Sequence, residues 1–164
     1  MPKNNYQNIV KKNKYQVFLA VSQGHAPFGF AVHPWFVCNK KGQISRWEIL
    51  LQKNPIENWG HLHKDNLSPF QGINTIPFFN KLKRTGRVLG VIEGDEHSIT
   101  EKMIDVIENS KNTYPYLDCY NLLGPNSNTY VQWVLNQFPE FPAKLPENAF
   151  GKNYLQTTGD SNKA

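Results

Sequence analysis

The sequence predicts an α+β domain in which a small antiparallel sheet packs against helices. Three runs rich in Val, Ile, Phe and Trp occur early in the chain and are separated by loops that contain Gly, which is typical of strands. Two segments of the second half carry apolar residues at helical intervals. With 164 residues, 39% of them hydrophobic, the chain is long enough to bury one core, so we expect a single domain over 1–164. Its ordered part is expected to cover about 15–155, between a polar N-terminal segment and a polar tail.

The predicted strands cover Tyr15–Ser22, Gly29–Cys38 and Ile44–Leu51. The second and third are expected to form a hairpin closed by "NKKGQ". The next segment, "QKNPIENWGHLHKDNLSPFQG", contains Pro, Asn and Gly too often for a long regular element. We expect it to connect other elements, with room for one short strand.

A short helix is predicted at "NTIPFFNKLKR", because Asn74 or Thr75 can cap it and Pro77 would lie in its first turn. A strand is expected at "RVLGVIEG". In "SITEKMIDVIENS", Ser98 and Glu101 have the spacing of a capping box and the apolar residues repeat at helical intervals, which predicts a helix. Another helix is expected to begin near Ser127, and the tail "QTTGDSNKA" is expected to be disordered.

Composition narrows the classes of partner and compartment. A net charge of +5 falls short of the clustered basic face of a nucleic-acid module, so nucleic acid is an unlikely partner. The chain has neither a secretory leader nor an apolar run of about 20 residues, which indicates a cytoplasmic protein without a transmembrane segment. Its two cysteines, Cys38 and Cys119, are too few for a disulfide scaffold and are expected to be reduced and buried.

The stretch "GPNSNT" is the first candidate for a functional site. A helix starting at Ser127 would place this serine on the same stripe as Val131, Val134 and Phe138, which faces the core. One interpretation is capping, since Asn126, Ser127, Asn128 and Thr129 are all good capping residues. The other is catalysis, because backbone N–H groups at a helix start can stabilise an oxyanion beside a nucleophilic serine.

A nucleophilic serine needs a base, and His33 is the best placed histidine. It interrupts an apolar strand in "FAVHPWFV", on the same strand face as Trp35. It could instead be a hydrogen-bonded core or edge-strand histidine, since Pro34 is typical of an edge. Glu48, or one of the alternating pair His61 and His63, could orient the ring, although a one-residue slip in register would turn Glu48 to the other face. The two histidines alone are a weak metal signal, and we expect no metal and no cofactor.

The ordered motifs "HPWFV" and "NSNTYV" resemble the permuted branch of the NlpC-type papain-like superfamily, which includes the lecithin:retinol acyltransferase-like proteins. In that branch a strand His precedes an Asn-Cys nucleophile motif that opens a helix. A closer resemblance is to an uncharacterised bacterial family, domain of unknown function 3750, through "HPWFV", "RWEI", "YPYLDCYNLLGPNSNTYVQWV" and "AFGKNYL". These pieces cover most of the chain from about Val17 to Leu155, and the segment around "GPNSNT" is the most specific of them.

This resemblance implies a permuted papain-like fold with Ser127 at the position of the nucleophilic Cys and His33 as the base. The implied function is a hydrolase or acyltransferase that acts on an amide or ester bond. From its place on the next strand, Glu48 is the candidate for the third catalytic residue, and we expect Asn126, Asn128 and Trp35 to line the substrate. The substrate is expected to be a small molecule or a peptide. The alternative is an inactive binding module of the same fold that holds a peptide or acyl ligand.

Overall fold

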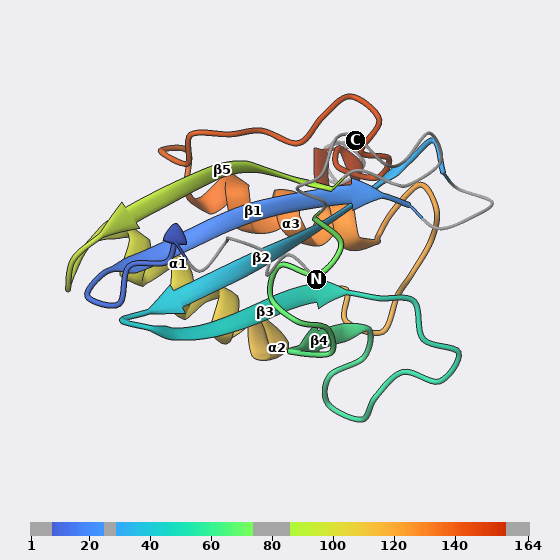
Figure 1. Cartoon of the computed structure of the whole chain (residues 1–164). Coiled ribbons are helices and arrows are strands. Elements are labelled where there is room, and N and C mark those ends of the chain that lie inside the picture. Colours follow the sequence, from blue (N-terminus) through green and yellow to red (C-terminus); the bar gives the residue numbers. More distant parts are fainter. Residues whose placement is uncertain (1–7, 25–28, 74–85, 157–164) are drawn as a thin grey trace.

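The computed structural model describes residues 8–24, 29–73 and 86–156 and consists of one sheet with helices on one of its faces. Figure 1 shows the five antiparallel strands, whose order across the sheet is β4-β3-β2-β1-β5. The expected α+β class is therefore observed. The strands are β1 (Tyr15–Gln23), β2 (Val32–Lys40), β3 (Gln43–Ile49), β4 (Leu62–Lys64) and β5 (Arg87–Gly94).

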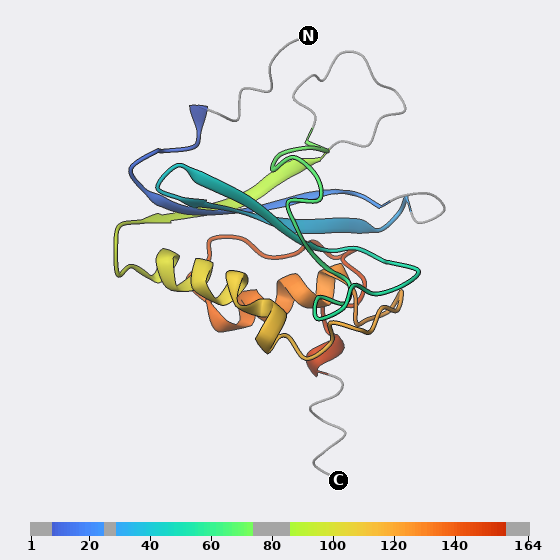
Figure 2. The same ribbon diagram turned by 90° about the horizontal axis from the view of Figure 1, so that it is seen from below.

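Helices cover one face of this sheet (Figure 2). They are α1 (Ile99–Glu108), the single turn α2 (Ser110–Thr113) and α3 (Ser127–Gln137). The Ser98 hydroxyl accepts a hydrogen bond from the Glu101 N–H at the start of α1, so the predicted cap is confirmed. Apolar side chains of α1 and α3 pack against alternate residues of the strands to form the larger core, which includes Val17, Leu19, Phe36, Trp47, Ile104, Ile107, Val131 and Val134.

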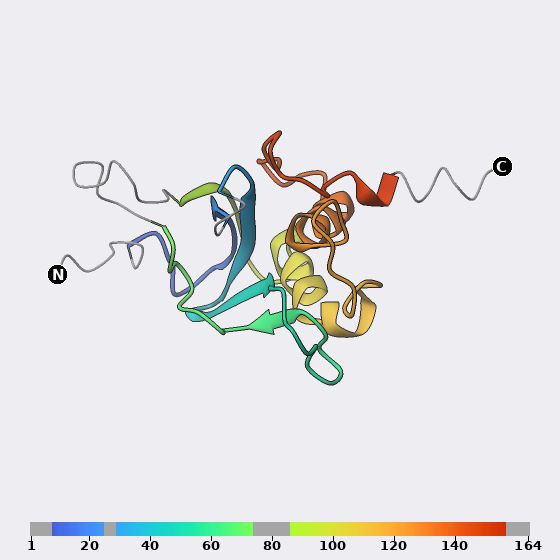
Figure 3. The same cartoon turned by 90° about the vertical axis from the view of Figure 1, so that its right-hand side faces the viewer.

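A second, smaller core lies on the opposite face of the sheet. It consists of Phe18, Ala20, Trp35, Val37 and Ile73. The segment after β4 crosses this face, as Figures 2 and 3 show, and the Trp35 indole donates a hydrogen bond to the Pro69 carbonyl 3.0 Å away. We call this the outer face, to distinguish it from the face that the helices cover. Burial on both faces explains why β1 and β2 have apolar residues in succession and lack a polar side.

The inner strand β2 tolerates Pro34 because of where the pairing with β3 stops. The last pair between these strands is Phe36 with Trp47, so Pro34 lies beyond the ladder that its missing N–H would have joined. On the other side it pairs with Val21 of β1. The edge position that proline suggested is therefore wrong for the strand as a whole, although this end of β2 has a free side toward β3.

The structure refines several boundaries predicted from the sequence. The second strand begins at Val32 rather than Gly29, and the third ends at Ile49 rather than Leu51. The expected short strand in the polar connection is β4, which pairs with β3. The predicted helix over 98–110 divides into α1 and α2 at Asn109. The helix predicted at 74–84 and the tail after 156 lie outside the described residues.

The two cysteines differ in environment. Cys38 is buried in the larger core, and burial raises the pKa of its thiol. Cys119 is exposed, so the expectation that both thiols are buried is wrong for this residue. It lies in the irregular segment between α2 and α3, where no regular alternation turns a side chain inward. In the described part of the chain, no helix has both the length and the apolar composition to cross a membrane.

Candidate functional site

Four side chains of β2 and β3 meet on the outer face of the sheet. They are His33 and Trp35 from β2, and Arg46 and Glu48 from β3. Residues two apart on a strand point to the same face, and the register of the two strands brings these pairs together. Glu48 Oε2 lies 2.8 Å from His33 Nε2, so the structure brings this pair of predicted site residues together.

Arg46 holds the Glu48 carboxylate from its other side. Arg46 Nε donates to Oε1 at 2.7 Å and its Nη2 donates to Oε2 at 2.8 Å, which is a bidentate pair. The guanidinium also donates to the carbonyl groups of Ser68 at 3.2 Å and Gln71 at 2.8 Å. Its central carbon lies 4.1 Å from the centre of the Trp35 ring. Four hydrogen bonds and the Trp35 ring therefore hold the Arg46 guanidinium, which fixes the position of the carboxylate.

Arg46 and Glu48 are buried, whereas His33, at the end of this hydrogen-bonded network, is accessible. The side chains of Arg46 and Glu48 are 2% and 1% exposed, whereas that of His33 is 20% exposed. The His33 ring also stacks on Trp35, with ring centres 6.1 Å apart. A solvent molecule or ligand can therefore contact His33 directly, whereas Glu48 is almost completely closed to it.

The charge of Glu48 decides which nitrogen of His33 carries a proton. Burial alone would raise the pKa of the carboxyl, but hydrogen bonds from His33 and Arg46 outweigh it and hold that pKa below its usual value. An ionised carboxylate can only accept hydrogen bonds, so His33 Nε2 must donate. In the neutral ring the lone pair then belongs to Nδ1, which is the atom able to take a proton from a substrate or nucleophile.

His61 and His63 are bound to Gln52 and not to His33. The Gln52 N–H donates to His61 Nδ1 at 3.1 Å, and the Gln52 amide nitrogen lies 2.9 Å from His63 Nε2. Burial lowers the pKa of His63, although Glu48 opposes this effect from the next strand. Among the three candidates for a third site residue, Glu48 is the one that contacts His33. The described residues contain no group of three metal-ligating side chains.

The stretch "GPNSNT" starts α3, and Asn126 is its cap. Asn126 Oδ1 accepts hydrogen bonds from the backbone N–H groups of Asn128 at 2.9 Å and Thr129 at 3.2 Å. The amide nitrogen of Asn126 donates to Phe150 O at 3.0 Å. Gly151, with φ of 89°, allows this approach, because a Cβ there would lie 2.6 Å from Asn126 Nδ2. Asn126 therefore ties the helix start to the C-terminal segment.

Ser127 and Asn128 form the first turn of α3 and are both 4% exposed. Burial raises the pKa of Tyr120, and a hydrogen bond with Ser127 partly offsets that rise. The Asn128 amide nitrogen donates to Val32 O at 3.3 Å and to Phe150 O at 2.9 Å. The helix start thus contacts the backbone of β2 one residue before His33.

The side chains of His33 and Ser127 nevertheless belong to different layers. Phe36, on the helix-covered face of β2, packs in one core with residues of α3, whereas Trp35 belongs to the core of the outer face. His33 stacks on Trp35 and so lies on the outer face. No hydrogen bond joins Ser127 and His33, both of which the structure describes. Catalysis by this pair stays a prediction, and the contacts of the two side chains favour separate roles.

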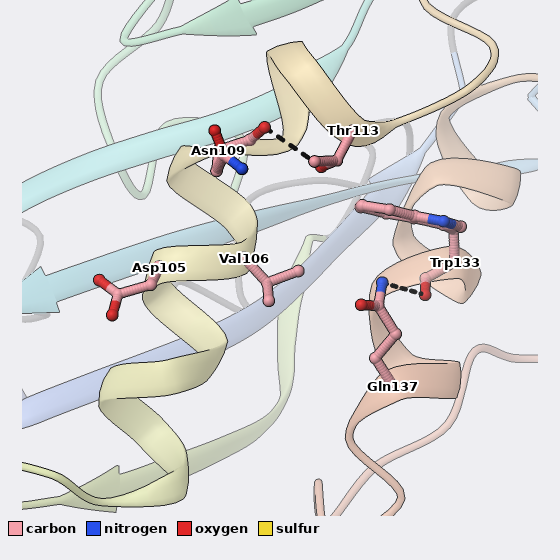
Figure 4. A pocket seen from close by; sticks show the side chains of 6 residues that line it. All are labelled: Asp105, Val106, Asn109, Thr113, Trp133 and Gln137. Atoms are coloured by element: carbon pink, nitrogen blue, oxygen red, sulfur yellow. Dashed lines mark hydrogen bonds between the residues drawn. The ribbon is translucent and has the colours of Figure 1, made fainter.

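A separate hollow lies on the helix side of the molecule (Figure 4). It is open between α1, α2 and α3, and the Trp133 ring forms one wall. Its other lining residues are Asp105, Val106, Asn109, Thr113 and Gln137. Because the helices and the sheet separate it from the outer face, this hollow cannot deliver a ligand to His33.

Sequence reasoning did not identify Arg46 or the carbonyl groups that hold it. The available signal was "RWE", in which Arg46 and Glu48 flank an apolar residue on a strand and must share a face. The contribution of the 66–73 segment had no such signal. Its contacts with Arg46 and Trp35 are long-range and depend on the path of an irregular chain.

The fold and the site define an α+β domain with a buried Arg-Glu pair that supports an accessible histidine. A family model described as "protein of unknown function (DUF3750)" matches residues 12–154, and the chain belongs to this family. Comparison with curated proteins and with solved structures finds no match to the chain.

Proposed function

We propose that the protein is a hydrolase or acyltransferase that acts on an ester or amide bond, with His33 as its general base. The observation that carries this proposal is the 2.8 Å contact between His33 Nε2 and Glu48 Oε2, held from behind by Arg46. Carboxylates that are themselves fixed by other groups commonly orient catalytic histidines and stabilise the imidazolium form during proton transfer. His33 therefore transfers the proton in the reaction, and Glu48 and Arg46 position the His33 ring.

The burial of Arg46 and Glu48 supports this assignment. A buried ion pair is often no more stabilising than apolar residues of the same size, because both charges lose their hydration. Here two charged side chains, 2% and 1% exposed, end at a single accessible imidazole. The arrangement is energetically costly, and a need to orient His33 explains why it is present. Charged groups with perturbed pKa values are also enriched at functional sites.

The chemistry requires one proton transfer in each direction. His33 Nδ1 takes the proton of a hydroxyl or water as that oxygen attacks the carbonyl carbon. The same nitrogen then gives the proton to the leaving alcohol or amine. In the permuted papain-like arrangement suggested by the sequence, the attacking group would be Ser127 at the start of α3. The proposal made here depends on His33 and not on that choice of nucleophile.

A second candidate function is an inactive binding module for a peptide or acyl ligand. It is favoured by the placement of Ser127 and His33 in different layers with no hydrogen bond between them, because the pair expected to be catalytic then lacks contact in the described structure. In such a module His33 and Trp35 would only contact the ligand, by hydrogen bonding and by stacking. The ligand would exchange freely and leave the protein unchanged.

Turnover of a panel of nitrophenyl esters and nitroanilides tests the first proposal. We expect His33→Asn to lower kcat/KM at least about 100-fold, the usual range for a general base. His97→Asn is the matched control, because the His97 side chain is 96% exposed and distant in the chain from the network. Wild-type protein that turns over no ester or amide would contradict the proposal. Turnover that is unchanged in His33→Asn would also contradict it. Either result would leave the binding module as the remaining candidate function.

A further inference from the structure

The residue directly opposite His33 in the sheet is a serine. β1 and β2 pair in regular antiparallel register, with Ser22 facing His33 and Ala20 facing Trp35. The ladder continues past this pair, since the Gly24 N–H donates to Ala31 O at 2.8 Å. Directly opposed residues of an antiparallel pair lie on the same face, with Cβ atoms about 5 Å apart. Ser22 is therefore the outer-face neighbour of His33 on the side away from Glu48.

The orientation of the His33 ring turns its second nitrogen away from Glu48. The two nitrogens of an imidazole lie on opposite sides of the line from Cβ through Cγ. Because Nε2 is turned toward Glu48 on β3, Nδ1 is turned away from Glu48, and the strand on the other side of β2 is β1. Nδ1 is also the nitrogen that keeps a lone pair when Nε2 donates to a carboxylate. The base atom thus faces away from Glu48, and Ser22 is the residue that the sheet register pairs with His33 on the side away from β3.

Ser22 is more available than Ser127. Ser22 is half-buried at the end of β1, and among the described residues its hydroxyl has no hydrogen-bond partner. Ser127 is 4% exposed and lies on the helix side. A nucleophile must reach both a base and a substrate, and Ser22 is the more exposed of the two serines and is the one in register with His33.

We propose that Ser22 is the nucleophile of this site, in a Ser22-His33-Glu48 row that runs across β1, β2 and β3. This inference rests on the function proposed above for His33. The Ser22 Oγ atom attacks the carbonyl carbon of an ester or amide while His33 Nδ1 takes its proton. The bond to the leaving alcohol or amine breaks as Nδ1 returns that proton to it, which leaves an acyl ester on Ser22. Water or an acceptor hydroxyl then attacks this ester with His33 as base, which releases the acid or a new ester and restores the Ser22 hydroxyl.

A fluorophosphonate probe tests the assignment, since it phosphonylates activated serines and its adduct can be located by peptide mass spectrometry. We expect the adduct on Ser22 in wild-type protein, its loss in Ser22→Ala and its retention in Ser127→Ala. His33→Asn should slow labelling of Ser22 at least about 100-fold. An adduct on Ser127, or no adduct on Ser22 in folded protein, overturns the inference.

A cysteine in place of the serine gives a second readout that does not require a known substrate. Beside an imidazole a thiol ionises more readily, so Ser22→Cys should react with iodoacetamide at neutral pH at least about tenfold faster than the exposed Cys119. Ser127→Cys is the matched control and should react no faster than Cys119. Adding His33→Asn to Ser22→Cys should remove the advantage, and an unchanged rate would refute the pairing.

The two proposals fail in different ways. Ester turnover that requires His33 but survives Ser22→Ala would exclude Ser22 and keep His33 as a base that acts on water or on another hydroxyl. Turnover and labelling that both ignore His33 would exclude the two proposals together.

Discussion

Glu48 Oε2 lies 2.8 Å from His33 Nε2, and this contact connects the accessible imidazole of the site to a carboxylate that is only 1% exposed. Arg46 already binds both oxygens of Glu48, so the carboxylate keeps a partner when His33 is removed. The imidazole, in contrast, depends on Glu48 for its hydrogen bond. Loss of His33 should therefore leave the Arg46–Glu48 pair intact, whereas loss of Glu48 should disturb both Arg46 and His33.

Replacing Glu48 tests this asymmetry through stability. Glu48→Gln leaves the Arg46 charge buried without a carboxylate, so the free energy of unfolding should fall by about 3 kcal/mol at neutral pH. The pKa of Glu48 is lowered from 4.5 in the folded protein, so its contribution is complete above that value and is lost as the pH falls through the lower folded pKa. Urea unfolding of wild type and variant should show a difference that narrows below about pH 4. A difference that does not change with pH would mean that Glu48 is not ionised in the folded state.

His63 should titrate below the usual range of histidine. Burial lowers its pKa from 6.5, against the opposing charge of Glu48, so the folded protein keeps this ring neutral where the unfolded chain already binds a proton. The unfolded state then binds more protons, and stability falls as the pH drops below 6.5. NMR titration of the ring should give a midpoint below 6.5, and His63→Gln should flatten the loss of stability on acidification. A midpoint at or above 6.5 contradicts this expectation.

The start of α3 should depend on Asn126 far more than on Ser127. Asn126 caps two backbone N–H groups and donates to three carbonyl groups, including Phe150 O. Asn126→Ala should lower the free energy of unfolding by about 2 kcal/mol or more, above the usual cost of a lost cap. Ser127→Ala removes one hydroxyl contact and should cost about 1 kcal/mol or less. Chemical unfolding measures both, and equal costs would make Ser127 as structural as the cap itself.

Two neighbouring tyrosines in the larger core provide a matched pair. The Tyr130 hydroxyl lies 3.0 Å from Ser110 Oγ, whereas the buried Tyr114 hydroxyl has no hydrogen-bond partner among the described residues. Tyr130→Phe should cost about 1 kcal/mol. Tyr114→Phe removes an unpaired polar group and should leave stability unchanged or raise it by up to about 1 kcal/mol. Urea or thermal unfolding compares them, and a Tyr114→Phe protein as unstable as Tyr130→Phe would reveal a bound partner for Tyr114.

Elements with a strong local pattern could be predicted from the sequence. The content of Val, Ile, Phe and Trp in the 15–22 and 29–38 segments predicted β1 and β2, and the Ser98 cap predicted the start of α1. β4 is only three residues long and exists because β3 pairs with it, so its sequence carries little signal of its own. The same holds for the 66–73 segment, which carbonyl contacts hold in place.

Only part of the candidate site could be predicted from the sequence, namely the residues that share one face of a strand. Strand alternation correctly grouped His33 with Trp35 on one face of β2. It did not say which face α3 would cover, because β2 is apolar on both sides and either face could meet a helix. A prediction that pairs His33 with a residue of α3 depends on that choice. Contacts between strands are safer, since the register of a sheet determines them directly.

The carbonyl groups of Phe150 and Gly151 receive three side-chain donors from the first turn of α3, from Asn126, Asn128 and Thr129. The segment that carries them has little regular secondary structure, yet the helix start would lose these two acceptors and three hydrogen bonds without it. Any shortened version of the domain made for crystallisation or for a fusion protein must therefore keep residues through at least Gly151. A boundary at the end of α3 would remove the segment that these hydrogen bonds join to the start of that helix.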